Sequence, residues 1–313
     1  MLTEGLEKKI DLAIKLYRRK IRSDVFRNIT VVAIAATATT LALHKQGIIN
    51  PQLPEDRIAL IEYHGVVSDS NDATNALKVT NLLSKLAEDS NTKAILFDLN
   101  SGGGSPVQAE ALYKAIQSLK DDEEPIKFYG SIGEICASAC VYVASALDEV
   151  YAHETSIVGS VGVRMDSWGL DKVIDKYGVE RRTLTVGDNK AIFDPFSPRN
   201  EDIEKHLKNE LLQPVYESFV TSVKEGRGDR ISDNEELYSG LVWGGVKAAE
   251  LGFTDGVLTS WEVREMLKGK YEVDQVAPYQ TTKKGIKVHI ETALTNVVDN
   301  WLENKANSGS IKF

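Results

Sequence analysis

Ser138 lies in a run of small residues and is a candidate nucleophile. Ser138 follows a predicted apolar strand and opens a predicted helix. If Ser138 attacks an acyl group, the backbone N–H of Ala139 is placed to donate to the oxyanion that develops. A serine at a helix start is also a common cap or a small packing residue, and that interpretation stays open.

A second segment, Asn100–Ser105, is rich in glycine and lies between an apolar strand and a predicted helix. Consecutive glycines let backbone N–H groups point into a cavity beside a helix start, which suits a phosphate or an oxyanion. The segment lacks the Lys-Ser/Thr of a nucleotide-binding P-loop and the spacing of a dinucleotide fingerprint. A plain turn is the alternative interpretation.

Lys190 lies in a third segment, where apolar side chains are frequent. A lysine that acts as a general base must be neutral, which requires burial to lower its pKa from about 10.4 toward 7–8. Ile192, Phe193 and Phe196 are near enough in sequence to supply that environment. The alternative is an ordinary surface lysine.

Other catalytic chemistries fit the sequence less well. Only His64 and His153 of the five histidines fall within the strand-rich region, and both are interpreted as structural. A Ser-Lys dyad of Ser138 and Lys190 is therefore favoured over a Ser-His-Asp triad. No clustered His, Asp and Glu residues suggest a metal site, and we expect neither a metal nor another cofactor.

The cysteines Cys136 and Cys140 are the only two in the chain. If both lay on one helix, four residues apart, their geometry would be poor for a disulfide. We therefore expect two small buried side chains.

Apolar runs alternate with helical patterns along the body of the chain. Short strands between helices predict βα units, hence an α/β fold with a largely parallel sheet. The predicted strands cover 58–63, 94–99, 126–129, 149–152, 160–163 and about 182–186, and the predicted helices cover about 72–88, 106–120, a stretch from 137, 170–177 and 201–225.

Charge is distributed unevenly over the 313 residues, whose net charge is -9. The first 50 residues carry nine Lys/Arg and four Asp/Glu, so the remainder carries -14. Such an acidic body is a poor partner for nucleic acid, and we expect none.

The N-terminal part predicts a membrane association. Residues 1–28 form a basic amphipathic segment suited to an anionic membrane surface or to a partner helix. Residues 29–45 form a short apolar anchor, and the preceding Lys and Arg place the N-terminus in the cytoplasm and the body outside it. A cleaved signal, with a small-residue site at Ala36–Ala38, and a buried soluble helix are the alternatives.

The rest of the chain divides into three predicted parts. Residues 46–56, with two prolines, form a linker, and residues 57–265 form the catalytic domain. Residues 266–313 hold a C-terminal amphipathic helix, with apolar residues from Ile290 to Leu302 on one face, and a tail.

Taken in order, the motifs resemble those of the bacterial signal peptide peptidase A family and its SohB-type relatives. Asn100–Ser105 resembles the family's Asn/Asp-Ser-Pro-Gly-Gly-Ser/Gly loop, and Ala137–Ser145 resembles its Ala-Ser-Gly-Gly-Tyr-Tyr-Ile-Ser segment. Gly159–Val163 resembles Gly-Ser-Ile/Leu-Gly-Val, and Glu225–Gly228 and Gly240–Asp255 resemble the C-terminal signature. The resemblance covers about residues 57–265.

The resemblance implies a Clp/crotonase-like spiral of βα units and a membrane serine peptidase. It makes Ser138 the nucleophile, Lys190 the general base, and the amides of Gly103 and Ala139 the oxyanion donors. It further implies a homo-oligomer in which serine and lysine can come from different subunits, and substrates such as remnant signal peptides or small unfolded segments.

The chain departs from the family pattern near the oxyanion site. Gly102 replaces the loop proline, and Ala139 and Cys140 replace two glycines. A catalytically degenerate membrane scaffold therefore remains an alternative. Acyl-CoA chemistry on the same fold and a phage-type capsid maturation protease are further ones, although neither accounts for the anchor.

Overall fold

The computed structural model describes residues 20, 55–122 and 125–281. Its folded body lies within the compact unit Asp56–Gly285. The predicted N-terminal anchor at 29–45 and the predicted C-terminal helix near 290–302 lie outside the described residues. Within the described part of the chain, no helix has the length and apolar character to cross a membrane.

An eight-stranded, mostly parallel sheet forms the body, with the order β6-β5-β3-β2-β1-β8 along its main path. The strands β1 (Arg57–His64), β2 (Thr92–Ser101) and β3 (Lys127–Ala137) pair in parallel, and β8 (Gln275–Tyr279) pairs with β1. Ile58 to Ile61 of β1 are all buried. Such continuous apolar strands are typical of a parallel sheet covered on both faces.

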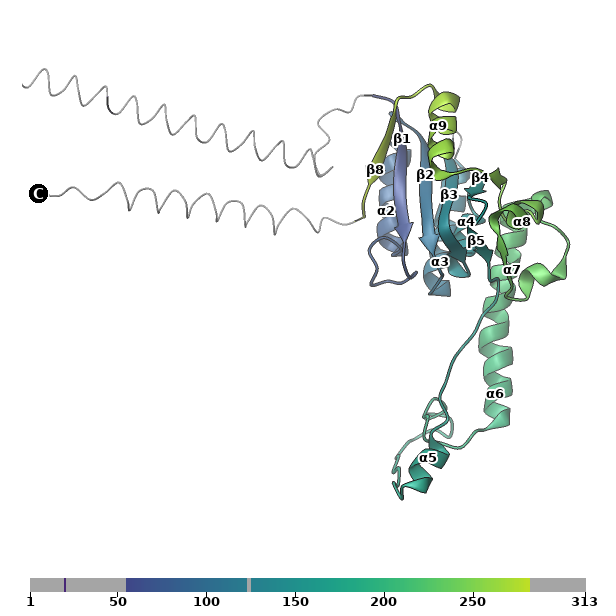
Figure 1. Cartoon of the computed structure of the whole chain (residues 1–313). Helices are drawn as coiled ribbons and strands as arrows, with labels where there is room; N and C mark the ends of the chain where they lie inside the picture. The colour runs from purple at the N-terminus through teal and green to yellow at the C-terminus, as the bar shows by residue number, and fades with distance from the viewer. Residues whose placement is uncertain (1–19, 21–54, 123–124, 282–313) are drawn as a thin grey trace, which may run out of the picture. The chain divides into compact units, whose positions relative to one another are not determined.

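Helices cover the two faces of this sheet (Figure 1). On one face, Ala59, Ile61 and Tyr63 belong to a core shared with α2 (Ala76–Ala87) and α3 (Pro106–Lys120). On the other face, Ile58 and Leu60 belong to a second core shared with α9 (Ser260–Tyr271). Successive residues of a strand point to opposite faces, so one strand supplies both cores.

The sheet divides along β3. Tyr129–Ile132 pair with β4 (Glu149–Ala152), which also pairs with β7 (Gly256–Val257). Further along, Ile135–Ala137 pair with β5 (Ile157–Gly159), whose other neighbour is the antiparallel strand β6 (Val242–Gly244). The first part of β3 therefore pairs with β4 and its last part with β5, and the chain then enters α4 (Ala139–Ala144).

Residues 162–212, here called the arm, have no buried residue. The arm contains α5 (Asp171–Lys176), α6 (Glu201–Leu207) and a π-helical turn (Lys208–Leu212), which continues into α7 (Gln213–Arg227). Figure 1 shows α5 away from the sheet, at the end of the arm. After α7 come the short helical turns Gly228–Arg230 and Glu235–Tyr238, and then α8 (Gly245–Glu250).

The α/β prediction with a mostly parallel sheet is confirmed, and α3 has the predicted bounds. The strand predicted at 160–163 lies at Ile157–Gly159 instead. The strand predicted at 182–186 is wrong: this stretch has no strand, and Leu184 is 100% exposed. The domain boundary predicted at 265 falls inside α9, and the sheet continues beyond it through β8.

Candidate active site

Ser138 lies in the turn between β3 and α4, with φ 53° and ψ -121°. A residue other than glycine at positive φ carries strain of about 1–3 kcal/mol, and such strain tends to occur at functional sites. The turn is held by hydrogen bonds from the Ser138 N–H to the Gly159 carbonyl at 2.9 Å and from the Tyr142 N–H to the Ser138 carbonyl at 3.1 Å. The Ser138 hydroxyl has no hydrogen-bond partner among the described residues, so it is available to a substrate.

Ala139 and Gly103, the two predicted oxyanion donors, both lie beside this turn. The N–H of Ala139 is at the first position of α4 and has no partner among the residues described. A Cβ placed on Gly103 would lie 3.2 Å from that nitrogen, so the glycine loop runs directly past it. The Gly103 N–H, however, donates to Ser101 Oγ at 3.1 Å. One of the two amides is therefore free, and the other is engaged within the loop.

A short bridge to the segment after β1 fixes the glycine loop. The Val67 N–H donates to the Gly103 carbonyl at 2.9 Å, and the Ser105 N–H donates to the Val67 carbonyl at 2.8 Å. Ser105 also caps α3, since its side chain accepts from the Gln108 N–H. The loop is thus held at Gly103 and at Ser105.

Cys136 and Cys140 form a disulfide, contrary to the prediction of two free buried side chains. The prediction failed because it placed both residues on one helix. Cys136 lies in β3 and Cys140 in α4, and the turn at Ser138 between them brings their Cα atoms to 5.1 Å. Both residues are fully buried, as predicted.

Lys190 lies in a turn of the arm and is exposed. Its ammonium group has no hydrogen bond or ion pair with another described residue. The apolar environment predicted around it does not form within one chain, because Phe193 is 60% exposed and Phe196 packs against Arg181 instead, at 5.2 Å. No contact joins Lys190 to Ser138 in the described part of the chain.

One salt bridge and one backbone hydrogen bond involve Asp194, in the segment that follows Lys190. Arg181 Nε donates to Asp194 at 2.8 Å, and Asp194 also accepts from the Phe196 N–H. These hydrogen bonds lower the pKa of Asp194, and the one from Arg181 has the largest effect. The segment around Asp194 therefore makes local polar contacts, although none of the residues in this part of the arm is buried.

Each of the two histidines considered above has a polar neighbour away from Ser138. His153 Nε2 accepts from the Ser260 N–H at 3.1 Å, which links the end of β4 to the start of α9. His64 Nε2 lies 3.4 Å from an oxygen of Asp98. Neither contacts Ser138, and the described residues hold no cluster of potential metal ligands.

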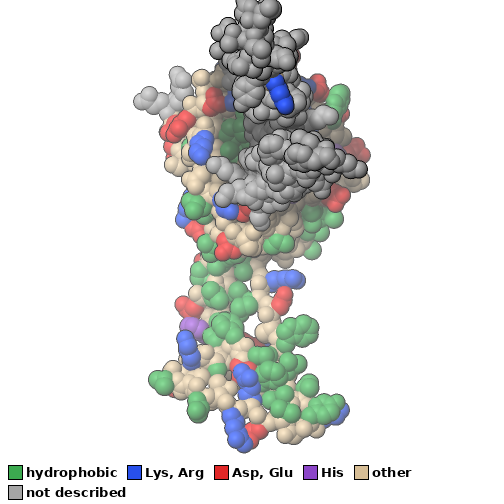
Figure 2. Space-filling model, turned by 90° about the vertical axis from the view of Figure 1, so that its left-hand side faces the viewer, with side chains coloured by type: hydrophobic (Ala, Val, Ile, Leu, Met, Phe, Trp, Pro, Cys, Tyr) green, Lys and Arg blue, Asp and Glu red, His purple; other side chains and the backbone are tan. Residues whose placement is uncertain are grey.

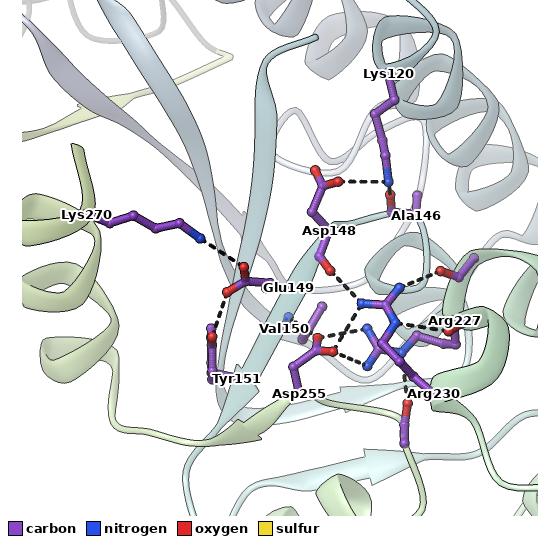
Figure 3. Close-up of polar contacts among 12 residues, drawn as sticks. Lys120, Ala146, Asp148, Glu149, Val150, Tyr151, Arg227, Arg230, Asp255 and Lys270 are labelled. Atoms are coloured by element: carbon purple, nitrogen blue, oxygen red, sulfur yellow. Dashed lines mark hydrogen bonds and ion pairs between the residues drawn. The ribbon is translucent and has the colours of Figure 1, made fainter.

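A buried ionic network surrounds Arg227 and Asp255 (Figure 3), two residues for which the sequence predicted no role. Both terminal nitrogens of Arg227 donate to Asp255 at 2.9 Å, and Arg227 Nε donates to the Gly252 carbonyl at 2.8 Å. Asp255 also accepts from the Val150 N–H at 2.7 Å and from Arg230 at 3.1 Å. Arg227 lies in Glu225–Gly228 and Asp255 ends Gly240–Asp255, the two segments that resemble the family's C-terminal signature, and this resemblance was the signal in the sequence.

This network anchors α7, and α7 supports the helix that follows Ser138. Tyr142 of α4 packs against Phe219 of α7 with ring centroids 5.0 Å apart, and the Ser222 hydroxyl donates to the Tyr142 hydroxyl at 3.0 Å. Burial lowers the pKa of Arg227, although Asp255 opposes that change. Burial alone would raise the pKa of Asp255, but the hydrogen bonds and charge of Arg227 outweigh it, so this pKa is lowered.

Comparisons with known proteins identify the family of this chain. A family model described as peptidase family S49 matches residues 119–274, a range that includes both Ser138 and Lys190. The chain is 36% identical to a protein named Na(+)/H(+) antiporter NhaA from Brucella abortus over 69% of its own length, and it spans 29% of that protein. It is 25% identical to a protein of Enterococcus faecium provisionally named signal peptide peptidase SppA, over 80% of this chain and 71% of that protein. It is 26% identical to Protease 4 of Haemophilus influenzae, over 64% of this chain and 33% of that protein. The chain belongs to peptidase family S49.

Proposed function

We propose that the chain is a serine endopeptidase in which Ser138 is the nucleophile and Lys190 the general base. The observation that carries this proposal is the turn at Ser138. Among the described residues, neither its hydroxyl nor the N–H of Ala139 that follows it has a hydrogen-bond partner, and its backbone is held at positive φ. Lys190 supports the proposal because its ammonium group is not engaged elsewhere among the described residues.

The reaction follows from these groups. Neutral Lys190 accepts the hydroxyl proton as Ser138 Oγ attacks the scissile carbonyl, and the Ala139 N–H donates to the oxyanion. The Gly103 N–H becomes the second donor when its hydrogen bond to Ser101 Oγ breaks and a hydrogen bond to the oxyanion forms. The protonated lysine then gives its proton to the leaving amine, which leaves an acyl ester on Ser138. Water, deprotonated by the lysine, hydrolyses this ester and restores both residues.

Lys190 is proposed to act on Ser138 of a second copy of the chain. The arm that carries Lys190 presents large apolar side chains to solvent, with Trp168 80% exposed and Leu184 100% exposed. Figure 2 shows hydrophobic side chains on the lower part of the molecule in that view. Exposed apolar surface of this extent is typical of a protein interface. Packing of the arm against a neighbouring copy would also supply the desolvation that a neutral lysine requires.

Peptide cleavage by the full-length chain tests both parts of the proposal. Ser138→Ala and Lys190→Ala should each remove most activity, and Lys190→Arg should be inactive because a guanidinium stays protonated. Near-normal cleavage by Ser138→Ala or Lys190→Ala would contradict the dyad.

Co-expression of the two inactive variants tests whether the dyad is shared between copies. In a ring of randomly mixed subunits, about a quarter of the sites combine an intact serine with a neighbour's intact lysine. About a quarter of the wild-type activity should therefore return. If both groups came from the same chain, no site would be complete and no activity would return.

The remaining proposals concern location, substrate and fold. We propose a single-pass anchor at 29–45 with the catalytic body outside the cytoplasm, acting on remnant signal peptides or small unfolded segments. The Cys136–Cys140 disulfide supports this location, because disulfides persist mainly in oxidising compartments. The parallel βα units support a Clp/crotonase-like spiral.

A reporter that is active only after export, fused after Phe313, tests this topology. The fusion should be active, and the full-length chain should be found in the membrane fraction. A reporter that is active only in the cytoplasm would overturn the topology, and a soluble mature chain that begins near residue 39 would replace the anchor with a cleaved signal.

A further inference from the structure

The disulfide encloses the proposed nucleophile within the short stretch of backbone 136–140. Cys136 is two residues before Ser138 and Cys140 is two residues after it. Cys136 is held in the sheet, where it is paired with Ser101 of β2 and Val158 of β5. The bond therefore joins the sheet covalently to the first turn of α4.

The other restraints on this turn come from the sheet on one side and from α4 on the other. α4 has six residues, and its N-cap, Ser138, makes no side-chain capping hydrogen bond. A helix of that length is not stable on its own, so it depends on its attachments. The backbone of Ser138 is in a strained conformation that persists only where the surroundings enforce it. Besides the hydrogen bonds of the sheet and of α4 itself, two backbone hydrogen bonds and the disulfide act directly on residues 136–140.

We propose that the Cys136–Cys140 disulfide is a positioning element for Ser138 and the Ala139 amide, which makes turnover dependent on the oxidised state of this pair. This inference rests on the proposed peptidase function. Reduction by a small dithiol breaks the Sγ–Sγ bond. Two electrons and two protons pass to the cysteines, and the dithiol becomes its own cyclic disulfide. The freed turn can then relax from positive φ, which moves Oγ and the Ala139 N–H away from a common carbonyl.

A merely structural disulfide would have a different effect. Loss of a structural bond lowers the free energy of unfolding but leaves kcat unchanged while the protein stays folded. A positioning bond acts on the reacting atoms, so its loss lowers kcat while KM, set by substrate contacts elsewhere, stays nearly constant. The two roles are therefore separated by kinetics on folded protein.

The experiment compares the full-length wild type with Cys136→Ala/Cys140→Ala. The double alanine variant avoids placing a hydroxyl in a fully buried site. Val143→Ala is the matched control, because it removes buried volume from the same helix and leaves the disulfide intact. Thermal unfolding is recorded for each protein, and kinetics are measured below every unfolding midpoint.

We expect the double variant to lose kcat by about 10- to 100-fold with KM within about twofold of wild type, whereas Val143→Ala keeps its kcat. Wild type that is unfolded, reduced and refolded without air should show the same loss and regain activity on reoxidation. Since the chain has no other cysteine, thiol titration reports this pair alone. The dithiol should not affect the double variant.

Three results would overturn the inference. They are wild-type kcat in the folded double variant, an equal loss of kcat in Val143→Ala, and free thiols at both positions in the untreated protein. If oxidised wild type cleaves no peptide at all, the proposed function fails instead. In that case, amide hydrogen exchange of residues 137–142 tests the inference by itself. Faster exchange after reduction would support the inference, and equal exchange in the two redox states would overturn it.

Discussion

Gly103 lies so close to Ser138 that a Cβ on the glycine would be 2.7 Å from the Cβ of the serine. The same atom would be 2.8 Å from the Ala137 carbonyl oxygen, and Gly103 has φ +101°. Both the space and the backbone conformation at this position therefore require glycine.

Gly103→Ala should displace the Ser138 turn. We expect kcat to fall by about 100-fold or more, because small displacements of reacting groups are costly, and stability to fall by about 1–3 kcal/mol. Peptide cleavage and urea unfolding measure the two effects.

Gly102→Ala is the matched control in the same loop. A Cβ on Gly102 would meet nothing within 4 Å. This variant should stay within about 0.5 kcal/mol of wild-type stability and keep its activity. An equal loss of kcat in both variants would show that activity depends on the loop in general and not on the close approach of Gly103 to Ser138.

Ser138→Gly and Ser138→Ala are both expected to be inactive, but they should differ in stability. Alanine at this position keeps the strain of φ 53°, whereas glycine adopts that conformation freely. The glycine variant should therefore be at least as stable as the alanine variant, despite the usual entropic cost of glycine of about 0.5–1 kcal/mol. Urea unfolding checks this order, and a glycine variant less stable by about that cost would indicate an unstrained turn.

The elements could largely be predicted from local sequence. α3 has the predicted bounds because Ser105 and Pro106 begin it and its apolar spacing continues to its end. The predicted strand at 182–186 failed for a different reason: Leu184 and Val186 alternate as in a half-buried strand, yet both are exposed. An alternating pattern indicates which apolar side chains would gain from burial, but it does not indicate whether residues of the same chain bury them.

The local structure at Ser138 was predictable from the sequence, whereas the contacts around it were less so. Ser138 and Ala139 lie at a strand-to-helix turn as expected, because a short-range pattern fixes that turn. The disulfide was missed because whether Cys136 and Cys140 can meet depends on the backbone direction at Ser138. Arg227 and Asp255 are 28 residues apart, and no local pattern pairs residues at that separation.

Asp255→Asn should destabilise the body by about 3 kcal/mol, since it leaves the buried guanidinium of Arg227 without its counter-charge. The Arg227 side chain is 1% exposed and that of Asp255 is 16% exposed. Glu250→Gln, which affects the exposed Lys247–Glu250 pair, is the control and should cost no more than about 0.5 kcal/mol. Urea unfolding at neutral pH measures both, and similar values for the two would mean that the buried pair adds nothing beyond a surface contact.

The pH dependence of unfolding follows from the same carboxylate. The pKa of Asp255 is lower in the folded chain, where the stabilising effect of Arg227 outweighs the cost of burial, than the value of about 3.9 for an unfolded chain. A group with a lowered folded pKa stabilises the fold fully above its unfolded pKa, and this contribution is lost as pH falls through the folded pKa. The stability difference between wild type and Asp255→Asn should therefore be constant from neutral pH to about pH 5 and shrink below about pH 4. Urea unfolding midpoints at pH 7, 5, 4 and 3 check this, with Glu250→Gln as the control for general acid effects. A difference that stays constant through the acid range would mean that the loss in Asp255→Asn comes from packing and not from the charge of Asp255.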